Sequence, residues 1–255
     1  MSADLDRWAW VGDPSPLLFW VGGSLLVYAL VVNAWWWGRN SWHPPYRQTL
    51  VELGRFLFYL GIPYLALGGW PQRPYRGLLS LQDLGLVGLG GQWPVTRWLS
   101  VVGIGLGWGL AALLILVIAW AGANRRSDAM QLSFSSHPWW WILIDVLYLQ
   151  VHWAFYRGAL AVALNDAFIG SSLGLGLIYL EWCLNPFWRQ EWRLEVHAAA
   201  PWLRAALALV MAVLFFLTRN LWICLGVHCA LEFCLRRLDY SHRRQKAHTS
   251  PAVVG

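Results

Sequence analysis

Three ionisable residues, Asp145, His152 and Arg157, interrupt a segment that is otherwise apolar enough to enter a lipid bilayer. Ionisable side chains in hydrocarbon are costly, so they are rare there and usually face a partner or a wet cavity. Together with Tyr148 and Tyr156, Asp145 and His152 follow spacings of three, four and four, which place them on one face of a helix. A polar face on an apolar helix predicts polar partners on neighbouring helices.

Two later apolar segments carry groups that could be those partners. One of them contains Glu181. The other has four polar residues spaced by four, which share one helix face: Cys224, His228, Glu232 and Arg236. With His152, these helices offer two imidazoles and two carboxylates at membrane depth. Such groups can act as general acids and bases or as metal ligands.

Composition identifies the class of protein that must position these groups. Of the 255 residues, 58% are hydrophobic and 13% are charged, and the mean hydropathy is +0.45. A soluble domain has about a quarter of its residues charged, so we predict a membrane protein. Its 21 Trp cluster near the ends of apolar segments, as in Trp35 to Trp37 and Trp139 to Trp141. Indole side chains anchor helices at the headgroup level.

Seven segments are long and apolar enough to cross a bilayer, whose hydrocarbon core requires about twenty apolar residues in a helix. We expect an all-α fold over residues 1–255, a polytopic membrane helical bundle in one domain. The expected spans lie near residues 17–36, 50–70, 98–121, 138–160, 168–187, 202–217 and 221–235. Residues 188–200 read as an interfacial connector, and residues 236–255 as a basic cytoplasmic tail.

Smaller features predict structure and not chemistry. Glu52 and Arg55 are three residues apart and should form a local ion pair, and Asp145 is expected to pair with a neighbour. Asn165 and Asp166 favour a turn between the fourth and fifth spans. Alternating glycines in the third span favour close helix packing: Gly103, Gly105, Gly107 and Gly109.

The charge distribution predicts an orientation. The net charge is +6, and the basic residues sit in loops and in the tail. Membrane topology therefore explains them better than nucleic-acid binding does. In a seven-span bundle, most of the basic loops and the tail fall on one side, which should be cytoplasmic. We expect the N-terminus outside and the C-terminus in the cytoplasm of a bacterial inner membrane, although Arg73, Arg76 and Arg97 fall on the other side.

Residues 80–235 resemble a known family, the intramembrane glutamic endopeptidases related to CAAX prenyl proteases and bacteriocin-processing proteins. Its first motif, Glu-Glu-x-x-x-Arg-Gly, ends as Arg157-Gly158 does here. Leu177 to Glu181 falls where the second motif, Phe-x-x-x-His, is expected. Asn220 to Glu232 looks like the third motif, which has Leu-Trp followed by His-x-x-x-Asn. Asp83 to Leu86 is similar to an Asp-Leu-Gly-Leu stretch of the family.

The resemblance implies a CAAX-protease-like core and a set of site residues: His152, Arg157, Glu181, His228 and Glu232. In the family, the first glutamate and two histidines activate water, and the asparagine helps to stabilise the oxyanion. Here the paired glutamates are replaced by His152 and Trp153, the second-motif histidine by Glu181, and the asparagine by Glu232. An ionised Glu232 would repel an oxyanion, so the ordinary family mechanism is in doubt.

Three functions follow as alternatives. In the first, which we favour, the chain is a non-catalytic scaffold or binding subunit in the membrane, and its polar groups satisfy one another. In the second, it is a diverged intramembrane peptidase in which Glu181 acts as base while His152 and His228 polarise the carbonyl. In the third, His152, Glu181, His228 and Glu232 bind a metal or cofactor. The sequence names no cofactor; the expected partners are the bilayer and either other membrane subunits or a peptide substrate.

Overall fold

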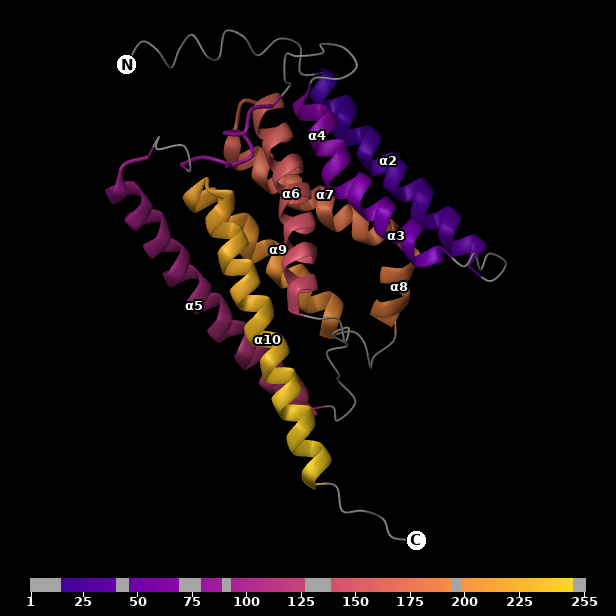
Figure 1. Cartoon of the computed structure of the whole chain (residues 1–255), viewed down its shortest axis with the longest axis vertical. Helices are drawn as coiled ribbons and strands as arrows, with labels where there is room; N and C mark the ends of the chain where they lie inside the picture. The colour runs from indigo at the N-terminus through magenta and orange to yellow at the C-terminus, as the bar shows by residue number, and fades with distance from the viewer. Residues whose placement is uncertain are drawn as a thin grey trace.

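The protein is described by a computed structural model covering residues 15–39, 46–68, 79–88, 93–126, 139–193 and 199–249. These residues form helices joined by short turns, and no strand occurs among them, so the predicted all-α fold is confirmed (Figure 1). The elements are α2 (Ser15–Gly38), α3 (Arg47–Phe56), the π-helical turn η1 (Leu57–Gly61), α4 (Ile62–Leu67), α5 (Val95–Arg126), α6 (Trp139–Ala163), α7 (Ala167–Leu184), α8 (Pro186–Arg193), α9 (Ala199–Thr218) and α10 (Leu221–Thr249).

Five helices are long and apolar enough to cross a membrane. They span Pro16–Gly38, Arg47–Leu67, Val95–Gly122, Ala167–Leu184 and Pro201–Thr218. Each lies within three residues of a predicted span at both ends. The fourth and seventh predicted spans correspond to α6 and α10, which form helices but carry the polar stripes and are less apolar. These five helices identify the chain as a multi-pass membrane protein.

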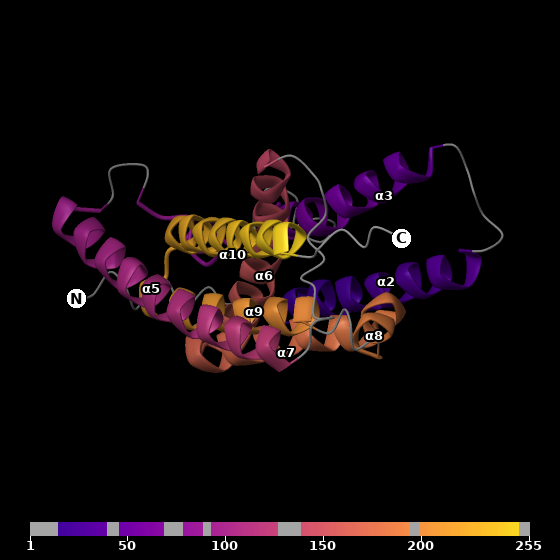
Figure 2. The ribbon, with the colours of Figure 1, turned by 90° about the horizontal axis from the view of Figure 1, so that it is seen from below.

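Helix α6 is central to the bundle. It packs against α2, η1, α7 and α10, and Figure 2 shows it near the middle of the molecule, with α5 to one side and α2 and α3 to the other. A helix surrounded by protein can carry polar residues that a lipid-facing helix cannot. This position explains why the predicted polar stripe falls on α6.

The second span is one continuous helix that widens in the middle. Pro63 has no N–H to donate to the carbonyl of Tyr59, so the hydrogen-bond ladder is interrupted there. The turn just before it adopts the π conformation over Leu57–Gly61, which is frequent at functional sites. The wide turn lies against α6 and contributes two aromatic rings to its polar face.

Polar caps and glycines determine where helices turn and meet. The Asp166 carboxylate accepts the N–H groups of Phe168 and Ile169 at 2.8 and 2.9 Å, which starts α7 after the predicted turn. Two of the four predicted packing glycines lie against α10. A Cβ on Gly105 would stand 2.5 Å from Ile223, and one on Gly109 would stand 3.0 Å from Val227.

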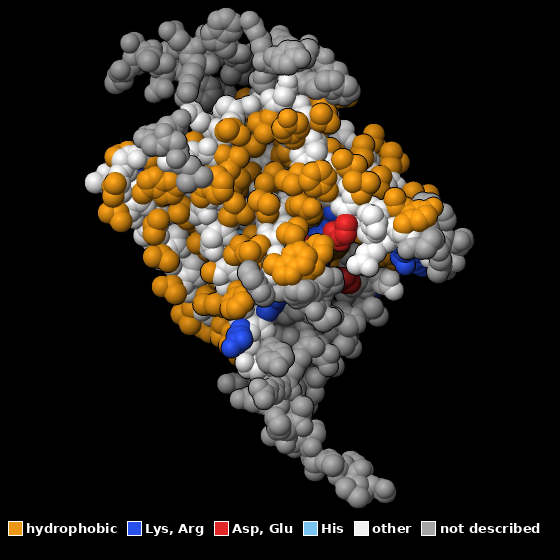
Figure 3. Space-filling model, viewed as in Figure 1, with side chains coloured by type: hydrophobic (Ala, Val, Ile, Leu, Met, Phe, Trp, Pro, Cys, Tyr) orange, Lys and Arg blue, Asp and Glu red, His pale blue; other side chains and the backbone are white. Residues whose placement is uncertain are grey.

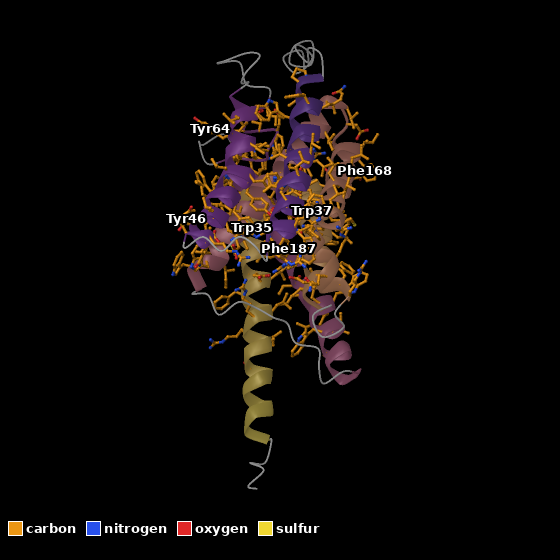
Figure 4. All side chains as sticks on the ribbon, turned by 90° about the vertical axis from the view of Figure 1, so that its right-hand side faces the viewer. Trp35, Trp37, Tyr46, Tyr64, Phe168 and Phe187 are labelled. Atoms are coloured by element: carbon orange, nitrogen blue, oxygen red, sulfur yellow. The ribbon has the colours of Figure 1, made fainter. Side chains whose placement is uncertain are left out.

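The outer surface is apolar, as a bilayer requires. On the face in Figure 3, hydrophobic side chains cover the upper part, and the charged side chains gather between α3 and α10. Figure 4 labels aromatic residues at two levels. Tyr64 and Phe168 lie toward the end where α2 begins, and Trp35, Trp37, Tyr46 and Phe187 lie lower. Two aromatic levels fit the interfacial anchoring expected from the tryptophan content.

Candidate functional site

The predicted polar stripe of α6 meets polar partners on four neighbouring elements. The Arg55 guanidinium, from α3, donates to Asp145 at 2.6 Å and to Glu52 at 3.2 Å, so both predicted ion pairs are confirmed. The ring of Tyr148 stacks on Tyr59 of η1 with centroids 6.1 Å apart. The next two stripe residues lie deeper, where they contact α7 and α2.

A buried hydrogen-bonded cluster joins α6 to α7 and α2. The Nε2 atom of His152 lies 3.0 and 3.1 Å from the two carboxylate oxygens of Glu181. The Tyr156 hydroxyl donates to Glu181 Oε1 at 2.5 Å and accepts from the Ser24 hydroxyl at 3.0 Å. All four side chains are buried. Because Nε2 faces a carboxylate, it is the nitrogen that carries a proton, and Nδ1 has no partner among the described residues.

Aromatic rings from η1 cover this cluster. The Phe58 and Tyr59 rings lie 4.7 and 5.2 Å from the His152 ring, and Tyr156 lies 4.5 Å from it on the same helix. His152 is only 1% exposed and Glu181 only 3%. The cluster is thus separated from bulk water by aromatic side chains, which strengthens its hydrogen bonds by lowering the local dielectric constant.

His228 belongs to a second contact, next to the first. The Gln150 amide donates to His228 Nδ1 at 2.9 Å, which places the proton of the neutral ring on Nε2. The Trp153 indole stacks on the imidazole with centroids 5.6 Å apart and an angle of 12°. Both histidines therefore point into the bundle, as predicted, but they contact different partners.

Arg157 and Glu232 do not contact the other predicted site residues. The expectation that all five side chains face one another is therefore wrong for these two. Arg157 lies five residues after His152, which turns it about 140° around the helix. It donates to the Met211 carbonyl of α9 at 3.2 Å and lies 4.5 Å from the Phe215 ring. Glu232 accepts from Arg236 one turn later at 2.8 Å, since residues four apart are neighbours on one helix face.

A cavity of about 220 Å³ lies beside these contacts. It is formed by the end of α7, by α8, by the middle of α6, by the first half of α9, and by parts of α2, α3, η1 and α10. Of the predicted site residues, only His228 and Glu232 line it. Its other lining residues are Tyr28, Arg55, Tyr59, Asp145, Val146, Leu149, Trp153, Trp182, Asn185, Trp188, Arg204, Leu207 and Arg236.

The geometry does not assemble a metal site. Nowhere in the described part of the chain do three His, Cys, Asp or Glu side chains come together as ligands. Glu181 is shared by His152 and Tyr156, His228 is held by Gln150, and Glu232 is held by Arg236. A metal ion needs several donors converging on one point, so the four predicted ligands do not fit that role.

Several site residues were not predicted, and their signals in the sequence are weak. Gln150 is a polar residue in the same apolar segment as His152. Its polarity in that segment is a signal from which it could have been predicted. Ser24 and Tyr28 are isolated polar residues in a largely apolar helix, and Tyr59 lies within the π turn that precedes Pro63. Arg204 follows an apolar stretch with no periodic pattern. Their contribution to the site becomes visible only from the packing of the helices against one another.

No protein-family model, curated protein or solved structure matches this chain. The roles of the site residues therefore rest on their chemistry and geometry.

Proposed function

We propose that the chain crosses the membrane seven times, with α6 and α10 as the two further crossings, and that it has a CAAX-protease-like core. The proposal is supported by the lengths of α6 and α10 and by the burial of their polar residues inside the bundle. Consecutive long helices also run in opposite directions (Figure 1). The motif positions His152, Glu181 and His228 lie on three helices that pack together through α6.

The positive-inside rule then gives an orientation with the N-terminus outside and the C-terminus in the cytoplasm. Arg39 follows the end of α2, Arg47 begins α3 and Arg189 lies in α8, the short helix after α7. In a seven-crossing bundle these positions fall on the same side of the membrane as the C-terminal end of α10. A bacterial inner membrane is the setting that this orientation and the arginine-rich composition favour.

Within that membrane, the protein acts as a non-catalytic scaffold or binding subunit. The observation that carries this proposal is that the Glu181 carboxylate is buried and fully engaged by neighbouring side chains. It accepts hydrogen bonds from His152 and Tyr156 and does not line the cavity. A general base has to reach the proton that it removes, directly or through one water. Glu181 is instead engaged as the acceptor that ties α7 to α6.

Affinity purification of the tagged full-length protein from its native membrane tests the proposal. A binding subunit should bring the same stoichiometric partner from wild-type and from Glu181→Gln membranes, as quantified by mass spectrometry. The variant keeps the size of the side chain and removes its basicity. Recovery of the protein with no stoichiometric partner would count against a scaffold.

A diverged peptidase is the second candidate, favoured by one specific observation. His152 and Glu181 form a direct pair at 3.0 Å on helices where the family has catalytic groups. Such a pair could become a base if η1 moved away and admitted water. This candidate predicts that processed peptides disappear from Glu181→Gln and His228→Ala membranes. Fragments that persist in both variants would exclude it, because a general base is not dispensable.

A further inference from the structure

Three guanidinium groups line the cavity. Arg55, Arg204 and Arg236 line it together with only two carboxylates, those of Asp145 and Glu232. Asp145 pairs with Arg55, and Glu232 pairs with Arg236. Arg204 takes part in none of the ion pairs formed between described residues. Arg55 is paired twice, with Asp145 and with Glu52, so among the arginines that line the cavity Arg204 is the one that these ion pairs leave for an anionic ligand.

Arg204 stands where the cavity meets solvent. Its side chain is exposed, and its guanidinium lies 5.6 Å from the centroid of the Trp188 ring. It belongs to the first part of α9, close to where that helix begins. In the proposed orientation this end faces the cytoplasm, at headgroup depth, where arginines meet anionic lipids.

The interior of the cavity is aromatic. Trp188 stacks on Trp182 with centroids 4.5 Å apart and an angle of 4°, Trp182 contacts Trp153, and Trp153 stacks on His228. All four rings line the cavity. Tyr28 and Asn185, hydrogen-bonded to each other at 2.7 Å, add polar groups to the wall. The site thus combines a cation at its mouth with an amphipathic wall behind it.

The volume limits the size of the ligand. Pockets for drug-sized ligands occupy about 300–1,000 Å³, and the 220 Å³ here is smaller than that range. A large pigment does not fit, whereas a polar headgroup does, provided that its hydrocarbon chains stay in the bilayer. The apolar helix surfaces around the bundle offer those chains their place.

We propose that this cavity binds the phosphodiester headgroup of an anionic phospholipid, with Arg204 as the residue that recognises its charge. The inference rests on the proposed binding function and names its ligand class. Basic pockets between membrane helices at the cytoplasmic side are suited to such headgroups. Guanidinium groups bind phosphate oxygens through paired N–H donors.

The test is a lipid titration of the full-length protein in detergent, followed by native mass spectrometry. Dioleoyl phosphatidylglycerol should bind more tightly than dioleoyl phosphatidylcholine, and Arg204→Gln should weaken phosphatidylglycerol about fivefold. That factor corresponds to about 1 kcal/mol, the contribution of one interfacial cation. Arg97→Gln is the matched control, since Arg97 is also exposed and lies 4.2 Å from the Trp93 ring but outside the cavity. Arg204→Lys should retain the preference.

Equal preference in wild type and Arg204→Gln would overturn the proposal. So would competition by inorganic phosphate as strong as that of the lipid, which would identify a site for free phosphate. A second measurement needs no variant. The preference of the wild-type protein for phosphatidylglycerol over phosphatidylcholine should fall as the salt concentration is raised. A preference that does not change with salt would also contradict the proposal. Detection of peptidase activity would refute the non-catalytic function and leave the lipid titration unaffected, so the two failures are distinguishable.

Discussion

At the scale of single residues, the carboxylate of Glu181 depends on the groups around it. Tyr156→Phe removes one donor and leaves His152 in place. A buried charged acceptor that loses a partner costs about 1–3 kcal/mol, more than the ~0.6 kcal/mol of an average interhelical hydrogen bond in a membrane. We expect Tyr156→Phe to lower stability by about 1–2 kcal/mol, measured as a loss of thermal stability in detergent.

The matched control for this substitution is Tyr64→Phe, because Tyr64 is 75% exposed and its hydroxyl is not part of the cluster. It should leave the unfolding temperature unchanged. Ser24→Ala removes the hydroxyl that contacts both Tyr156 and the Val21 carbonyl, and its unfolding temperature should fall between the two. An unfolding temperature of Tyr156→Phe equal to that of Tyr64→Phe would show that the hydroxyl does not stabilise the Glu181 carboxylate.

At the scale of helices, the contact between α5 and α10 depends on which glycines face the partner. Gly105 is buried against Ile223, whereas a Cβ on Gly107 would meet nothing within 4 Å. Ile223 is β-branched and stiff, so Gly105→Ala should push the helices apart at a cost of about 1–3 kcal/mol. Gly107→Ala should be neutral or stabilising, since alanine is the better helix former. Equal thermal stability of the two variants would argue against this contact.

The helices themselves could be predicted from the sequence, because about twenty consecutive apolar residues in a bilayer have few alternatives. The stripe of α6 was also predictable, since its spacing defines one face. What the sequence could not supply was the partner of each polar group. Arg157 donates to α9, and Glu232 pairs within its own helix. Which partner each side chain meets depends on how its helix is rotated about its own axis, and a sequence motif does not define that rotation. The π turn beside His152 lies just before the hydrogen bond that Pro63 cannot donate to the Tyr59 carbonyl, and apolar periodicity does not reveal such a turn.

At the scale of the whole molecule, the number of crossings and the orientation can be tested together. With seven crossings and the N-terminus outside, the turn between α6 and α7 faces outward and α8 faces the cytoplasm. If α6 and α10 did not cross, the same N-terminus would put that turn inside and α8 outside. Two exposed positions distinguish these arrangements, Leu164 and Arg189.

Cysteine labelling gives opposite results in the two cases. In a background with the four native cysteines replaced by alanine, Leu164→Cys should react with a membrane-impermeant maleimide on intact cells. Arg189→Cys should react only after permeabilisation. The reversed pattern would mean either five crossings or an inverted bundle, and a C-terminal tag separates these, because it stays cytoplasmic with five crossings and is outside in the inverted bundle. The expected pattern would place the mouth of the cavity, and with it Arg204, on the cytoplasmic side, where anionic headgroups can reach it.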